Sequence, residues 1–141
     1  MFGTLAYYTT RFHRSFTAFT TARLQELGLS FGSLFPVIYV GKHPGCTQAQ
    51  LTAALGMDWG YSQRCITKLV EDGFLTRQKE GRAYHLALSP KGEEAFAASH
   101  QVFFDWDREV LKALDPAEQE QLFALLGKVQ KKEGAAPSTK P

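Results

Sequence analysis

A run of hydrogen-bonding side chains between residues 59 and 68 has the chemistry needed to recognise the edges of base pairs. An arginine can form a bidentate pair with guanine, and a glutamine can form one with adenine. Serine, tyrosine and lysine can bond either bases or phosphate oxygens. Because Ile66, Leu69 and Val70 mark the apolar side of a predicted helix, the polar residues are expected to face outward and contact double-stranded DNA. They are Tyr61, Ser62, Gln63, Arg64 and Lys68.

Three further cations follow in a short basic hairpin. Residues 74–79 and 83–88 alternate apolar and polar side chains, which is typical of extended strands, and a glycine-containing turn joins them. This hairpin carries Arg77, Lys79 and Arg82, which we expect to lie beside the duplex. The arginine at the tip, Arg82, is suited to an adjacent minor groove.

Start signals along the chain define the helices that position these side chains. Thr47 and Gln50 have the spacing of a capping box, Asp58 can cap the next helix, and Ser89-Pro90 is a third start signal. The predicted order is four helices, a hairpin and two more helices. A short helix, a tight turn, a second helix and a hairpin together form a helix-turn-helix with a wing.

We therefore expect a mainly α-helical protein with a small β-hairpin wing, in which a winged helix-turn-helix lobe lies on a helical base. The 141 residues of the chain suit one domain, 1–141, with the DNA-binding lobe at residues 30–89. Residues 1–29 and 90–132 are predicted to form a dimerisation region, because their Phe- and Leu-rich stripes have little else to cover them. Residues 133–141 are predicted to form a flexible tail.

The distribution of charge is consistent with a central region that meets a polyanion. Residues 30–92 hold seven Lys and Arg against four Asp and Glu, whereas residues 93–141 hold six against nine. The overall net charge of +2 is too small to indicate nucleic-acid binding by itself. The basic centre beside an acidic C-terminal third favours a protein that presents only its middle to DNA.

The sequence contains no motif of an enzyme, a cofactor site or a metal site. Cys46 and Cys65 lack CxxC spacing, and the four histidines form no pattern. Nucleophile elbows, phosphate-binding loops and dinucleotide fingerprints are absent as well. We expect a non-enzymatic protein without a metal or cofactor. The lack of a long apolar run or signal peptide leads us to expect a cytoplasmic protein.

Several patterns in the central part of the chain match those of a known family. RCI and LVEDGFL, within residues 64–75, resemble the pattern R-x-V-x-x-L-x-x-x-G-L-V, and LSPKG at 88–92 resembles L-T-x-x-G. Glu80-Gly81-Arg82 stands where that family has D-x-R, with glutamate in place of aspartate. HPGCTQAQLTAALG at 43–56 resembles P-G-x-T-x-x-E-L-A. Over residues 5–130 the chain thus resembles the MarR family of winged-helix regulators.

The resemblance implies a homodimeric repressor that binds a palindromic operator. Its first helix and last two helices would interdigitate with those of a second copy. Regulators of this kind often respond to a small aromatic or lipophilic effector bound between the base and the lobe. The residues expected to line that crevice are Phe12, His13, Phe16, Phe31, Phe35 and Tyr39.

Two other functions remain open at this point. Oxidation of Cys65, which lies in the proposed recognition helix, would disturb DNA contact directly and give a thiol-based redox regulator of the same fold. A winged-helix module that binds only proteins is the second alternative. It predicts no salt-dependent affinity for duplex DNA.

Overall fold

The computed structural model describes residues 3–133, with side chains through residue 130. Within that range the helices are α1 (Leu5–Gln25), α2 (Leu34–Lys42), α3 (Gln48–Ala54), α4 (Trp59–Glu71), α5 (Pro90–Val110) and α6 (Pro116–Glu133). The remaining elements are a 3-10 helix, η1 (Phe31–Ser33), and the strands β1 (Cys46–Thr47), β2 (Leu75–Glu80) and β3 (Ala83–Leu88). The predicted tail lies outside the described residues from residue 134 onward.

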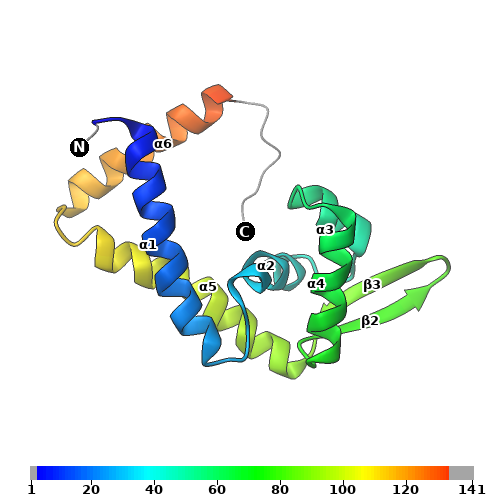
Figure 1. The fold of residues 1–141 in the computed structure, drawn as a ribbon. Helices are drawn as coiled ribbons and strands as arrows, with labels where there is room; N and C mark the ends of the chain where they lie inside the picture. Colours follow the sequence, from blue (N-terminus) through cyan, green and yellow to red (C-terminus); the bar gives the residue numbers. More distant parts are fainter. Residues whose placement is uncertain (1–2, 134–141) are drawn as a thin grey trace.

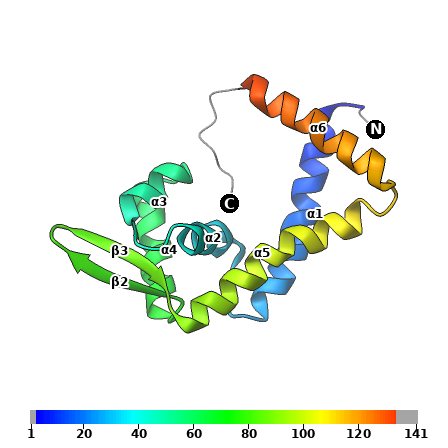
Figure 2. The ribbon, with the colours of Figure 1, turned by 180° about the vertical axis from the view of Figure 1, so that it is seen from behind.

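The molecule is elongated and has two distinct ends (Figure 1). One end contains α1, α6 and the C-terminal half of α5, and we call it the helical base. The other contains α2, α3, α4 and the sheet, and we call it the winged lobe. The view from behind shows α5 running from the β2–β3 hairpin into the helical base (Figure 2). The predicted fold, mainly helical with a small wing, is confirmed.

The helix starts predicted from the sequence are present as hydrogen bonds. The Thr47 hydroxyl accepts a hydrogen bond from the backbone N–H of Gln50 at 3.1 Å. The side-chain oxygen of Gln50 accepts one from the backbone N–H of Thr47 at 2.9 Å, which completes a capping box. The Asp58 carboxylate accepts from the Tyr61 amide at 3.0 Å, and Ser89 caps α5 in the same way. Each bond satisfies a backbone N–H that a helix leaves free at its N-terminus.

A three-stranded antiparallel sheet with the order β1-β3-β2 supports the wing. Lys79 pairs with Tyr84 near the tip of the β2–β3 hairpin, and Cys46 of β1 pairs with Leu86 of β3. Strand β1 was not predicted, because two residues are too few to show an alternating pattern. It fixes the base of the wing to the segment between α2 and α3.

The core of the winged lobe is continuous from α2 through α4 to the sheet. Phe96, in the N-terminal half of α5, packs against Gly41 of α2, so α5 also contributes to this core. Helix α4 contacts α3, η1 and β2 along its apolar side. The fully buried side chains include Leu34, Val37, Ile38, Val40, Leu51, Ile66 and Leu86.

Candidate DNA-binding surface

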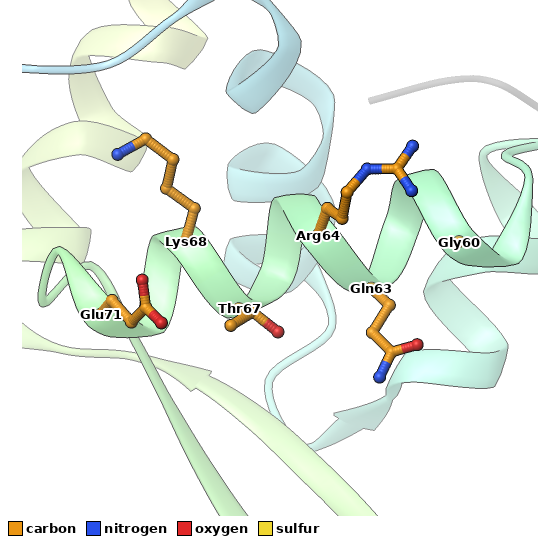
Figure 3. A pocket seen from close by; sticks show the side chains of 6 residues that line it. All are labelled: Gly60, Gln63, Arg64, Thr67, Lys68 and Glu71. Atoms are coloured by element: carbon orange, nitrogen blue, oxygen red, sulfur yellow. The ribbon is translucent and has the colours of Figure 1, made fainter.

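The outward side of α4 carries polar side chains, several of them exposed to solvent (Figure 3). Asp58 caps the helix, while Ile66 and Leu69 are buried on its opposite side. The helix is thus anchored along one side and open along the other. A shallow hollow of about 430 Å³ follows the open side and is lined by Gly60, Gln63, Arg64, Thr67, Lys68 and Glu71.

Ser62 does not belong to this surface, and the prediction that it faces outward is wrong. Its side chain is fully buried, and its hydroxyl lies 2.6 Å from that of Thr52 in α3. The positions of Ile66 and Leu69, four and seven residues later, place Ser62 on the apolar side of the helix. Because the Thr52 hydroxyl donates to the Gln48 carbonyl at 2.7 Å, Ser62 donates to Thr52.

Tyr61 lies at the edge of the open side and is half exposed. Its hydroxyl approaches the η1 turn so closely that a Cβ added at Gly32 would lie 2.7 Å from the phenolic oxygen. The ring helps to line an apolar cavity of about 350 Å³ with Phe31, Phe35 and Met57. Tyr61 therefore connects the start of α4 to η1 and α2.

Gly60 leaves room for the side chain of Arg64. A Cβ added at Gly60 would lie 3.4 Å from Arg64 Nη1 and 3.3 Å from an Asp58 carboxylate oxygen. The Arg64 guanidinium extends toward Gly60, along the open side of the helix (Figure 3). The absence of a side chain at Gly60 thus leaves space beside the guanidinium that is predicted to contact bases.

Three residues on the open side were missed from the sequence, namely Gly60, Thr67 and Glu71. All three are separated from Arg64 by the three-, four- or seven-residue spacings that define one helix face, so the periodicity contained the signal. Lys68, by contrast, was predicted and is exposed, but its ammonium forms an ion pair with Asp72 at 3.0 Å. That cation is partly neutralised in the free protein.

The hairpin places its three predicted cations in different surroundings. Arg82 is exposed beside the tip of the turn. The Arg77 guanidinium lies 5.6 Å from the centre of the Tyr84 ring, and the Lys79 ammonium lies 5.9 Å from it. Tyr84 was not among the predicted site residues, although it alternates with Leu86 along β3 and so shares the face of that buried residue.

On the opposite face of the hairpin, His85 ties the wing to the rest of the lobe. Its Nδ1 lies 2.8 Å from the Gly45 carbonyl oxygen, in the turn before β1. Its Nε2 lies 3.8 Å from a carboxylate oxygen of Glu80. Glu80 therefore contacts the neighbouring strand of the wing.

The cysteines are in surroundings that do not favour thiol chemistry. Burial raises the pKa of the Cys65 thiol, whose sulfur lies 3.7 Å from the Gly32 carbonyl oxygen. Burial also raises the pKa of the Cys46 thiol. A raised pKa reduces the fraction of reactive thiolate. Among residues 3–133, no group of three His, Cys, Asp or Glu side chains is arranged to hold a metal ion.

The six residues predicted to line one effector crevice are divided among three places. Phe12, His13 and Phe16 line an apolar cavity of about 570 Å³ between α1, α5 and α6. Phe31 and Phe35 line the smaller cavity beside Tyr61. Tyr39 lines neither cavity and packs on the His43 ring, with the ring centres 4.4 Å apart. The Phe16 and Phe31 rings meet edge to face between the two cavities, at 6.2 Å.

Within the described part of the chain, no helix is both long and apolar enough to span a bilayer.

Comparison with known proteins identifies a relative along almost the whole chain. None of the protein-family models compared with the chain matches it. Over 131 residues it is 47% identical to the HTH-type transcriptional regulator BilQ of Clostridium symbiosum, and the match covers 91% of each protein.

Solved structures share the fold at lower sequence identity. A MarR transcriptional regulator from Methanosarcina mazei has a TM-score of 0.82 at 20% identity, over 92% of this chain and 88% of that chain. A MarR family protein from Mycobacterium tuberculosis in complex with DNA has a TM-score of 0.77 at 20% identity, over 91% and 98%. The complex of that protein with salicylic acid has a TM-score of 0.70 at 21% identity, over 91% and 97%.

Proposed function

Because the chain belongs to the MarR family of winged helix-turn-helix transcriptional regulators, we propose that it is a repressor that binds a palindromic operator as a homodimer. In each protomer α4 enters the major groove, where Gln63 and Arg64 bond base edges. The hairpin lies alongside, with Arg82 in the adjacent minor groove. The protein has no catalytic role in this proposal and acts on DNA in the cytoplasm.

The observation that carries this proposal is the two-sided character of α4. Ile66 and Leu69 fix the helix to the core, while Gln63, Arg64 and Lys68 remain exposed on the other side. A DNA-reading helix needs both properties, because an unanchored helix would lose orientation and a covered one could not reach the bases. The M. tuberculosis protein of the same fold, solved with DNA, supports the assignment.

Apolar exposure in the helical base supports the dimer. Leu5, Phe12, Phe123 and Leu126 are all more than two-fifths exposed and line the larger cavity. Exposed apolar surface of this kind is typical of an interface. In the proposed homodimer, the α1, α5 and α6 helices of a second copy cover it.

The smaller cavity is the better candidate for an effector. It is apolar, and Phe31 and Phe35 contribute to its wall together with Tyr61 of α4. A planar aromatic molecule bound there would act directly on the start of the recognition helix. The related M. tuberculosis protein has been solved with salicylic acid, which belongs to this chemical class.

Selection of bound duplexes from a random pool tests the DNA-binding proposal. The expected result is a palindrome with half-sites about one helical turn apart. Replacement of Arg64 by Ala should then cost about 1–3 kcal/mol of binding free energy and relax specificity at one position in each half-site. Arg108→Ala, which removes an equally charged side chain from the helical base, is the control. Failure to enrich any sequence, with no salt-dependent affinity for duplex DNA, would favour the protein-interaction module.

Titration with salicylate tests the effector proposal on the selected duplex. The expected result is release of the duplex by wild-type protein, and loss of that response in Phe35→Ala with DNA affinity retained. His43→Ala, which removes an exposed ring outside both cavities, should respond like wild type. Release that persists in Phe35→Ala would exclude the smaller cavity.

A further inference from the structure

Tyr84 is the one residue of the wing that contacts two cations at once among those the structure describes. Its side chain is 47% exposed, so burial in the core does not account for its position. The Arg77 guanidinium and the Lys79 ammonium both lie over its ring, at 5.6 and 5.9 Å from the centre. The electron-rich face of an aromatic ring attracts such groups at this range.

The strand register places these three side chains on the face of the hairpin that packs toward the helices. Lys79 is directly opposite Tyr84, and Arg77 is opposite Leu86. Leu75 and Leu86, on the same face, are buried in the core that also contains α4. Arg77 and Lys79 therefore lie on the face of the hairpin that is directed toward α4, beyond the buried leucines.

We propose that Tyr84 is a positioning residue for DNA binding, which orients Arg77 and Lys79 toward the phosphate backbone beside the groove that α4 enters. This inference rests on the DNA-binding role proposed above. Long cationic side chains lose rotamer freedom when they bind phosphate. A ring that already restricts both side chains in the free protein lowers that cost.

An aromatic ring orients cations for phosphate binding better than an acidic side chain does, and Lys68 provides the contrast. Lys68 is held by the Asp72 carboxylate at 3.0 Å, so a phosphate must compete with a full negative charge for it. The Tyr84 ring has no net charge, and it orients two cations without neutralising them. Arg77 and Lys79 can therefore displace counterions from the duplex while they remain in contact with the ring.

Salt-dependent binding of Tyr84 variants to a mixed-sequence DNA duplex tests this proposal without knowledge of the operator. Leu at position 84 removes the ring but keeps an apolar side chain, and Phe keeps the ring without the hydroxyl. Tyr84→Leu should weaken binding about fivefold at moderate salt. It should also reduce the slope of log affinity against log salt concentration by about 0.9 for each phosphate contact that is lost. Tyr84→Phe should match wild type in both measurements.

Three comparisons decide the result. In the wild-type background, the slope should fall in Arg77→Ala and also in Lys79→Ala. When either substitution is combined with Tyr84→Leu, the further reduction in slope should be smaller than in the wild-type background. Gln78→Ala, on the opposite face of the hairpin, should leave the slope unchanged, and circular dichroism should show native folding in every variant. An unchanged slope in Tyr84→Leu, or an equal loss in Tyr84→Phe, would overturn the role of the ring. Wild-type protein without affinity for the duplex would contradict the DNA-binding proposal itself.

Discussion

The winged lobe and the helical base bury their apolar side chains to very different extents. In the lobe, Leu51 and Ile66 have no exposed surface. In the base, Phe123 is 49% exposed and Leu125 is 53% exposed. The lobe has enough neighbouring elements to complete its own core, whereas α6 extends beyond the elements available to cover it.

We therefore expect the winged lobe to determine the stability of the single chain and the helical base to determine its association. The lobe should lose stability when its core is altered, whatever the protein concentration. In the proposed homodimer, the base should respond chiefly through association, because its apolar side chains would gain their full burial only against a second copy. Four substitutions test this division.

The largest effect is expected from Leu51→Ala in α3. Truncation of a fully buried leucine removes its transfer free energy and leaves a cavity, which costs about 2–5 kcal/mol. Urea denaturation should show this loss at every protein concentration tested. An equal loss in Leu125→Ala, measured on dilute protein, would contradict the contrast between lobe and base.

Phe123→Glu in α6 should weaken dimerisation about tenfold or more, because it places a charge within an apolar interface. Sedimentation measurements over a range of concentrations give the dissociation constant. Gln121→Glu adds the same charge at an exposed neighbouring position and should leave the constant unchanged. If Phe123→Glu associates like wild type, α6 does not form the interface.

Ser62→Ala should cost about 1 kcal/mol of unfolding free energy, the usual contribution of one hydrogen bond. The loss is modest because the Thr52 hydroxyl keeps its bond to the Gln48 carbonyl. Thermal unfolding measures stability, and titration of a selected duplex measures DNA affinity. A large loss of affinity in a fully stable variant would return Ser62 to the DNA-binding surface.

The smallest effect concerns Asp105, where α5 meets α1. Hydrogen bonds from Gln101 and Arg23, together with the charges of Arg23 and Arg108, lower the pKa of Asp105. A carboxylate with a lowered pKa in the folded state stabilises the protein above its ordinary pKa, near about 4, and that contribution is lost as the pH falls through the lowered value.

Asp105→Asn should therefore reduce stability slightly at neutral pH and flatten its dependence on pH in the acid range. Thermal unfolding from neutral to acid pH measures both effects, and Glu120→Gln, an exposed acid on α6, is the control. An acid dependence as steep as that of wild type would show that the Asp105 contacts contribute little in solution.

Local signals in the sequence predicted the helix starts and the wing correctly. The capping box of Thr47 and Gln50 and the cap at Asp58 depend on residues three apart, so a single sequence contains all the information. The outward positions of Gln63 and Arg64 followed from the apolar periodicity of α4. The polar side chain of Ser62 predicted an outward position, whereas its spacing of four residues from Ile66 places it on the buried side of α4.

The parts of the candidate site that were not predicted depend on contacts between distant segments. Tyr84 acquires its role only when the strand register brings it against Lys79. The sequence could not show which aromatic residues of the expected crevice line which cavity, because a phenylalanine can pack equally well in either one. Phe31 and Phe35 lie beside Tyr61 only after η1 and α4 have packed together.

Helix α5 has a mechanical consequence for a regulator with these two ends. It contains 21 residues and is therefore about 30 Å long. One half packs in the lobe and the other in the base, so the helix acts as a lever arm between them. A tilt of about 10° at the base moves the far end by about 5 Å over this length. A rearrangement of the base helices that tilts α5 would thus displace the winged lobe by a few ångströms relative to the base.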